Sequence, residues 1–283
     1  MITPQIKLLQ QRDFGKKINT TFDFARQNFK PLLAALAFIA GPSALLSGVA
    51  QGVFQSNMLD LPRSMGMREN FTLYFSTGYL IVLVFSMLTS FLSFSVVVAY
   101  ITLYEKGEYT ITPAMVWQKI AENLVTGLTA AVVSFLLTIL ATLVLVLPGI
   151  YVAVCLQLFL FGIIREGLSA TDALKRSYAL VKTDWWATFG LLLVMSVVSA
   201  VLSFVFQIPL YIVTMLNTLG LSGELASLKP IMVFSSVLSI VGSTLVQGLI
   251  WISLGFQYFN LVEKVDRTGL WADVEQLGNP DHF

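Results

Sequence analysis

The charged residues of this chain are confined to short segments, and long charge-free stretches lie between them. Lys, Arg, Asp and Glu are absent from residues 31–59, 70–104, 123–164, 185–223 and 230–262. A helix needs roughly 20 apolar residues to cross about 30 Å of hydrocarbon. The stretch 123–164 is long enough for two crossings and each of the others for one, so the sequence predicts six membrane-spanning helices.

The predicted spans lie near 31–55, 72–104, 124–147, 149–166, 185–216 and 230–261. Pro148-Gly149 separates the third from the fourth, and this dipeptide is typical of a tight turn. A shallow re-entrant turn at the same place is the alternative. We therefore expect an all-α polytopic membrane protein in which residues 1–283 form a single integral membrane domain.

The composition excludes several classes of protein. Hydrophobic residues make up 56% of the chain and charged residues 12%, whereas a soluble domain carries about 25% charged residues. A soluble enzyme is therefore excluded, and the net charge of +1 argues against nucleic acid as a partner. One cysteine (Cys155) and one histidine (His282) provide no basis for a disulfide framework or a His- or Cys-ligated metal site. We expect no metal and no cofactor.

The basic residues indicate an orientation. If the N-terminus is cytoplasmic, only Arg63, Arg68 and Lys229 among the 17 Lys and Arg residues fall on the opposite side. Cytoplasmic loops of membrane proteins are enriched in Lys and Arg. We therefore predict that both termini are cytoplasmic and that a cytoplasmic tail covers 262–283.

A spacing pattern repeats before the first, third and fifth spans. Four apolar positions fall at i, i+4, i+7 and i+11 in each case: Ile18, Phe22, Ala25 and Phe29; Pro113, Trp117, Ile120 and Leu124; Leu174, Tyr178, Val181 and Trp185. This spacing places them on one face of an α-helix. We predict amphipathic helices near 13–29, 113–123 and 169–183, and a fold of three repeats, each an interfacial helix followed by a helical hairpin.

When the three stripes are aligned, Asn28, Asn123 and Asp184 coincide, and each precedes an apolar run. Asn and Asp are good N-caps because the side-chain oxygen accepts a bond from a free N–H of the first turn. We therefore predict that these three residues are helix N-caps.

The three amphipathic helices have two interpretations. They could form a cytoplasmic collar that touches lipid headgroups or a partner, or they could simply pack against the bundle. Trp117, Trp185 and Trp186 suit the membrane interface under either interpretation, and we expect them to be interfacial anchors.

The spans contain amides rather than charges. Gln157, Gln207 and Gln247 lie within the fourth, fifth and sixth spans, where they could line a polar cavity or hydrogen-bond between helices. Ionisable residues inside a bilayer usually mark transport routes, so their absence at depth counts against a proton-coupled transporter. No nucleophile–base pair can be assembled inside the membrane, so we do not expect an enzyme.

Small residues recur every four positions along the first span, at Ala40, Ala44, Gly48 and Gly52. Such a stripe lets two helix backbones approach closely. It could serve packing within the bundle, or it could form the face of a dimer or of a complex with another membrane protein.

The segment Leu147-Pro148-Gly149-Ile150 opens a short apolar helix, and Asp184-Trp185-Trp186 follows a segment of small, basic and apolar residues. Over residues 145–190 this resembles the YciC-type uncharacterised inner-membrane proteins. It is also similar to the membrane domain found beside some bacterial glycerophosphodiester phosphodiesterases. The resemblance implies a polytopic helical fold in a bacterial inner membrane, with no assigned chemistry. The chain has no room for the phosphodiesterase domain, so that activity is not carried over.

Three functions stay open. The first is a non-enzymatic scaffold or accessory subunit of a membrane complex, with another membrane protein as partner and a homo-oligomer also possible. The second is a lipid-binding or lipid-translocating protein, with membrane lipids as partner and a groove that reaches Gln157 and Gln247. The third is a facilitative carrier or channel for an uncharged solute, which is the least supported because no charged selectivity element is present.

Overall fold

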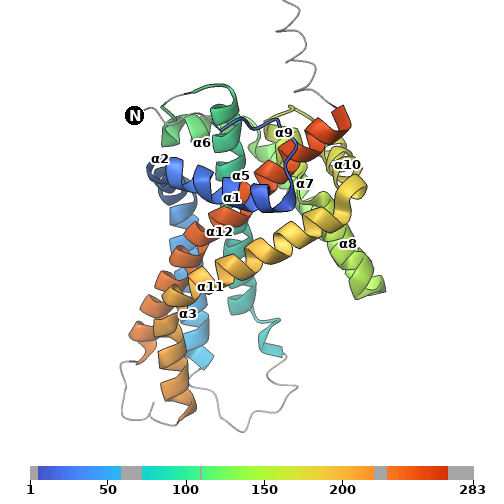
Figure 1. Cartoon of the computed structure of the whole chain (residues 1–283). Helices are drawn as coiled ribbons and strands as arrows, with labels where there is room; N and C mark the ends of the chain where they lie inside the picture. The colour runs from blue at the N-terminus through green and yellow to red at the C-terminus, as the bar shows by residue number, and fades with distance from the viewer. Residues whose placement is uncertain (1–5, 59–71, 109, 220–227, 267–283) are drawn as a thin grey trace, which may run out of the picture. The chain divides into compact units, whose positions relative to one another are not determined.

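The computed structural model describes residues 6–58, 72–108, 110–219 and 228–266. Over these residues the chain is built from helices and turns, with no β-strand (Figure 1). Six helical segments are long and apolar enough to cross a membrane: Phe29–Met58, Thr77–Glu105, Leu124–Val144, Val146–Ile164, Ala170–Thr218 and Leu228–Asp266. The predicted all-α class and the six predicted spans are confirmed. The tail from 267 onward lies outside the described residues.

The elements in chain order are α1 (Phe14–Gln27), α2 (Phe29–Ala35), the π-helix η1 (Leu36–Ala40), α3 (Gly41–Met58), α5 (Thr77–Glu105), α6 (Pro113–Ala121), α7 (Leu124–Val144), α8 (Val146–Leu156), α9 (Phe159–Ile164), α10 (Ala170–Val181), the 3₁₀ turn η2 (Lys182–Asp184), α11 (Trp185–Thr218) and α12 (Leu228–Asp266).

The chain divides into two compact units. The first unit comprises residues 1–32, 95–196 and 249–283, and the second comprises 33–94 and 197–248. Neither unit is one continuous stretch of sequence, because α5, α11 and α12 each contribute residues to both.

A helix is present at each of the three positions where the repeated stripe occurs. The N-caps of α1, α6 and α10 are Asp13, Thr112 and Ser169, and each side chain accepts a hydrogen bond from the N–H three residues later. A side-chain acceptor there satisfies one of the free N–H groups of the first turn. These caps explain why the three helices start where they do.

Of the three predicted N-caps, Asn123 holds that position at the start of α7, although its side chain makes no capping bond. Asn28 is instead the C-cap of α1, and its Nδ2 donates to the carbonyl of Phe24. Asn123 precedes α7, but its Nδ2 donates to the carbonyl of Lys119, and no side-chain bond caps α7. Asp184 ends η2 and accepts from Lys264. Each asparagine amide donates to a carbonyl of the preceding helix, because the last carbonyls of a helix have no partner within that helix.

One aromatic residue of each stripe is partly exposed. Phe22, Trp117 and Tyr178 occupy equivalent stripe positions and are 39%, 46% and 45% exposed. In α1 the whole buried face is shifted by one residue from the predicted stripe, since Lys17, Thr21, Phe24 and Asn28 are buried. The apolar stripe of α1 is therefore an outer surface of the first unit rather than its core.

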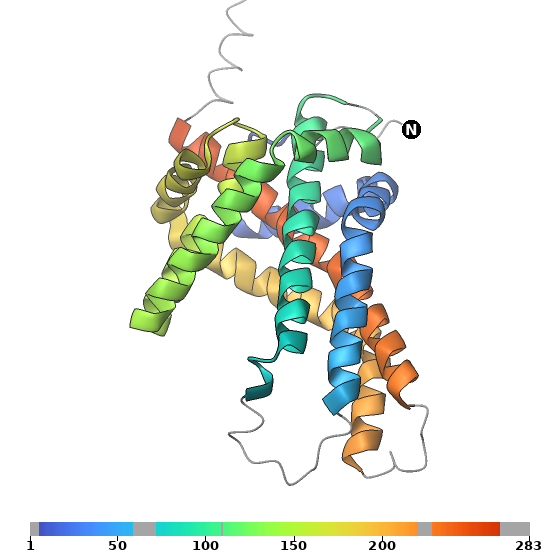
Figure 2. The same ribbon diagram turned by 180° about the vertical axis from the view of Figure 1, so that it is seen from behind.

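Helices α7 and α8 lie side by side as a hairpin (Figures 1 and 2). The predicted turn at Pro148-Gly149 is wrong. Leu145 alone separates the helices, in an extended conformation, and both residues lie in the first turn of α8. Proline is tolerated there because its missing N–H has no intrahelical partner. A Cβ on Gly149 would lie 2.9 Å from Thr142 Cα, so the glycine serves the close contact between the two helices.

The fourth span is interrupted. α8 ends at Leu156 and α9 begins at Phe159, and Ser177 of α10 bridges the gap. Its hydroxyl donates to the carbonyl of Cys155 at 2.7 Å and accepts from the N–H of Leu158 at 3.0 Å. Backbone groups freed by a helix break need such a partner when water is excluded.

In the second unit, the small-residue stripe of the first span packs against α12. A Cβ on Gly48 would lie 2.6 Å from the Cα of Val237, and one on Gly52 would lie 2.5 Å from the Cα of Val233. Ala40 and Ala44 on the same face are buried. Of the two interpretations of this stripe, the structure supports packing within the protein.

Candidate functional site

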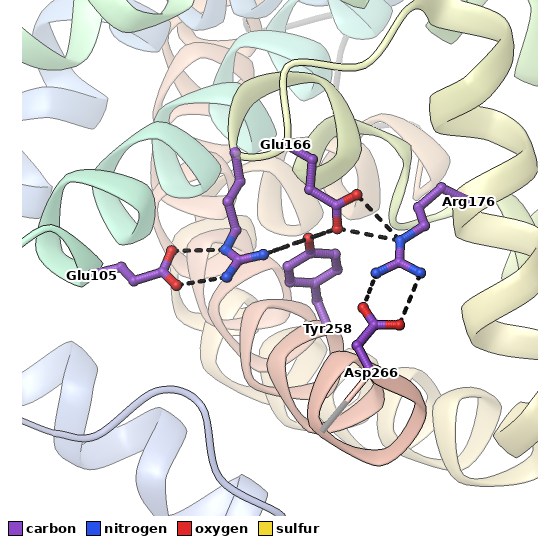
Figure 3. A network of polar contacts seen from close by, with 6 residues as sticks. Glu105, Glu166, Arg176, Tyr258 and Asp266 are labelled. Atoms are coloured by element: carbon purple, nitrogen blue, oxygen red, sulfur yellow. Dashed lines mark hydrogen bonds and ion pairs between the residues drawn. The ribbon is translucent and has the colours of Figure 1, made fainter. Parts of the chain in front are cut away.

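The first unit gathers charged side chains at the ends of its apolar helices. Glu105 is the last residue of α5, and Arg165 and Glu166 follow α9. Gly167 turns the chain toward α10 with a φ of +71°, a backbone conformation that glycine adopts without steric cost. Figure 3 shows these side chains meeting Arg176 of α10 and Tyr258 and Asp266 of α12. We call these six residues the α5–α12 network.

Arg165 joins α9 to α5 and α12. Its Nε and Nη2 donate to the two carboxylate oxygens of Glu105 at 2.8 and 2.7 Å, and its Nη1 donates to the Tyr258 hydroxyl at 3.1 Å. Two parallel bonds between a guanidinium and a carboxylate form the strongest common ion-pair geometry. Burial opposes the charge of Arg165, but the bonds and charge of Glu105 outweigh it and raise the pKa of Arg165.

Arg176 joins α10 to the same cluster. Its Nε lies 3.2 and 3.3 Å from the carboxylate oxygens of Glu166, and its terminal nitrogens donate to Asp266 (Figure 3). Tyr258 completes the connection, since its hydroxyl donates to Glu166 while it accepts from Arg165. The network therefore holds four helices together through one continuous set of charge-assisted hydrogen bonds.

Aromatic rings pack against the side chains of the α5–α12 network. The ring of Phe161 stacks on Tyr258 with centroids 4.6 Å apart and planes at 14°. The Arg165 guanidinium lies 5.0 Å from the ring centroid of Phe259. Packing against fixed rings reduces the rotamer freedom that an ion pair otherwise has to lose.

A second polar chain is buried in the first unit. Lys17 is 3% exposed, and its Nζ donates to Gln257 Oε1 at 2.6 Å, while Gln257 Nε2 donates to Thr188 Oγ1 at 2.8 Å. Burial lowers the pKa of Lys17, and the charge of the nearby Asp184 opposes part of that lowering. Here α1, α11 and α12 are joined through a buried cation and a neutral amide.

The arrangement of these groups is that of a structural clamp. Each arginine faces carboxylates from two elements or a carboxylate and a phenol, so its donors are matched by acceptors within the cluster. Among the residues that the structure describes, no group of three His, Cys, Asp or Glu side chains could hold a metal ion.

A family comparison covers most of these helices. The family described as a domain of unknown function (DUF7847) matches residues 30–258. The chain belongs to this family. The DUF7847 match includes every member of the α5–α12 network except Asp266, which lies beyond it. No curated protein and no solved structure matches the chain.

The three glutamines singled out in this DUF7847 chain do not form one site within either unit. Gln157 is the C-cap of α8 in the first unit, at the break before α9. Gln207 and Gln247 belong to the second unit, where Gln207 Oε1 accepts from Tyr211 at 3.1 Å. Gln257 was not singled out, although it is the fully buried amide with bonds to two helices. It lies on the same apolar helix as Gln247, and the sequence pattern alone does not distinguish the two amides.

The three tryptophans are placed differently from one another. Trp117 is exposed on α6 and Trp186 is 77% exposed at the start of α11. Trp185 is half-buried, and its ring stacks against Tyr151 on one side and Phe189 on the other, with centroids 5.6 and 5.0 Å away. The exposed pair suits the interfacial role, whereas Trp185 joins α8 to α11.

Proposed function

We propose that this DUF7847 protein is a non-enzymatic scaffold or accessory subunit of a membrane complex. The observation that supports this most is the exposure of α7, the first helix of the α7–α8 hairpin. In the most apolar part of Leu124–Val144 only 11% of the residues are buried inside the protein. The corresponding share in Val146–Ile164 is 61%. α7 therefore presents most of its surface outward from the chain.

The outer face of α7 is suited to a partner helix. Val125, Val132, Leu136 and Leu143 recur along one side and are all strongly exposed. The hydroxyls of Thr129, Thr138 and Thr142 each donate to a carbonyl of α7 itself, so these three side chains need no polar partner outside the helix. The occupant we propose is an apolar transmembrane helix of another protein, because no charge on α7 selects a polar one.

The charged groups support the same proposal. In the described part of the first unit the α5–α12 network pairs its arginines and carboxylates with one another. Such a network favours a rigid support for the hairpin over reactive chemistry. The environment that we propose is a bacterial inner membrane, with both termini in the cytoplasm, and the likeness of residues 145–190 to YciC-type proteins belongs to the same proposal.

Photo-crosslinking in native membranes tests the scaffold proposal. A photoreactive residue at Val132, Leu136 or Leu143 is expected to capture one and the same membrane protein, which also co-purifies in fixed stoichiometry in mild detergent. The matched control is Ala130, which lies on α7 but is fully buried. Adducts with lipid alone at all three exposed positions would show that bilayer, and not a partner, covers this face.

A further inference from the structure

A groove of about 690 Å³ lies in the first unit, between the start of α8 and the junction of α10 with α11. Its lining is mostly aromatic and aliphatic, with Leu147, Ile150 and Tyr151 from α8 on one wall and Trp185, Trp186 and Phe189 from α11 on the other. Trp185 Nε1 donates to the carbonyl of Tyr151 at 3.4 Å, which links the two walls. We call this feature the α8–α11 groove.

One end of the α8–α11 groove is charged, through Lys182 and Asp184. Lys264 Nζ lies 3.2 Å from the carboxylate of Asp184 and neutralises it. Lys182 is exposed, and its Nζ lies 5.7 Å from the ring of Tyr178. No acidic side chain in the described part of the chain pairs with Lys182, so the polar end of the groove carries a positive charge that is not neutralised.

We propose that the α8–α11 groove binds an anionic glycerophospholipid, with its phosphate at Lys182 and an acyl chain along Leu147, Ile150 and Phe189. An ammonium group beside apolar walls complements an amphiphile whose head is negative and whose tail is hydrocarbon. Trp186, which lines the groove and is strongly exposed, suits the level where headgroups meet acyl chains, because indole rings prefer that level.

The groove also differs from the lipid site expected from the sequence. None of Gln157, Gln207 and Gln247 lines the α8–α11 groove. The headgroup would be bound by the charge of Lys182 rather than by glutamine amides deep in the membrane. A rim position costs less free energy, since a cation there stays partly hydrated until the phosphate arrives.

Native mass spectrometry of the full chain in mild detergent tests the proposal. Phosphatidylglycerol and phosphatidylcholine are each added at equal concentration to the wild-type protein and to Lys182→Gln. We expect the wild type to retain phosphatidylglycerol in preference to phosphatidylcholine. Loss of one headgroup charge contact should weaken phosphatidylglycerol binding about fivefold in Lys182→Gln.

The control is Lys175→Gln, which removes the same charge from the same α10 region outside the groove. Lys175 has a 77% exposed side chain and faces Asp172 at 3.9 Å. An equal loss in both variants would overturn the proposal, since it would mean that binding reports only the net charge of the surface. No preference between the two lipids in the wild type would also overturn it.

A second variant tests the apolar walls. Ile150→Trp fills the groove from α8 and is expected to lower the retention of both lipids, while the melting temperature stays near that of the wild type because Ile150 is partly exposed. Unchanged retention in this variant, if folded, would rule out the groove as the acyl-chain site. If it does not fold, Trp186→Ala serves instead, because that side chain is mostly outside the protein. These outcomes do not depend on whether α7 binds a partner helix.

Discussion

Individual side chains in the first unit stabilise it mainly through bonds between helices that are far apart in sequence. Arg165 is 60 residues from Glu105, and Arg176 is 90 residues from Asp266. Their side chains are 19–30% exposed. At that exposure an ion pair is screened less than on an open surface, and removal of one partner leaves the other poorly hydrated.

Arg165→Met should therefore destabilise the protein by about 1–3 kcal/mol, because Glu105 and Tyr258 both lose their donor. Thermal unfolding in detergent measures this. The double variant Glu105→Gln/Arg165→Met should be less destabilised than the two single variants combined, since it leaves no unpaired charge. Strictly additive losses would contradict the coupling that we derive from the geometry.

Lys17 should make stability depend on pH in the alkaline range. Its pKa is below the ordinary value of 10.5 in the folded protein, so in the window just below 10.5 the unfolded chain binds more protons at this residue. Stability contributed by Lys17 therefore rises as pH rises through that window. The melting temperature of the wild type relative to Lys17→Met should increase from about pH 8 to about pH 10. A difference in melting temperature between the wild type and Lys17→Met that stays constant with pH would refute the interpretation.

Among the elements, the α7–α8 hairpin shows how a local motif can be misjudged. Pro148-Gly149 looks like a turn because both residue types punctuate chains. In the structure the proline lies in the first turn of α8 and the glycine permits contact with Thr142. Proline and glycine are found both in turns and in the first turn of a helix. Which of these structures forms here depended on the residues that face them across the hairpin.

Gly149→Ala should separate the two helices. The added Cβ would lie 2.9 Å from the backbone Cα of Thr142, which cannot move without shifting α7. We expect a loss of about 1–3 kcal/mol in thermal unfolding. Gly15→Ala in α1 is the control, since a Cβ there would approach nothing closer than 3.8 Å, and it should be neutral or slightly stabilising. A Gly149 variant as stable as the Gly15 variant would contradict the close approach.

For α1, α6 and α10 the sequence predicted where the helices lie but not which face of α1 is buried. The sequence pattern placed all three within a few residues of their observed bounds, because a 3.6-residue period is a local property. It did not decide which side of α1 is buried. The buried side carries Lys17 and Thr21, whose polar groups have partners on other elements or on α1 itself. A polar residue with a partner can be buried where an apolar neighbour stays outside.

For the whole molecule, the six apolar helices are compatible with a multi-pass membrane protein, and the basic residues predict its orientation. In a Cys155→Ala background, cysteines at Ser64 and Leu221 should react with a membrane-impermeant maleimide from outside the cell. A cysteine at Thr110 should react only after permeabilisation. The reverse pattern would show that the chain is inserted the other way round.

The six long apolar helices could be predicted from the sequence because the absence of charge over such a length is a local property. Because charged residues are excluded from about 30 Å of bilayer, each position of a spanning helix has to be uncharged, whichever residues it contacts. The fold class, the six long apolar helices and the positions of α1, α6 and α10 follow from such local properties of the sequence. Helix caps were also accessible in principle, since Asp13, Thr112 and Ser169 are ordinary capping residues.

Only the tertiary structure decided which side chains meet. The α5–α12 network, the buried chain from Lys17 through Gln257 to Thr188, the bridge made by Ser177 and the α8–α11 groove all join segments distant in sequence. Hydrogen bonds and ion pairs act over a few ångströms and require a defined direction. The residues that form them carry no periodic signal along the chain, so their partners appear only when the helices are placed beside one another.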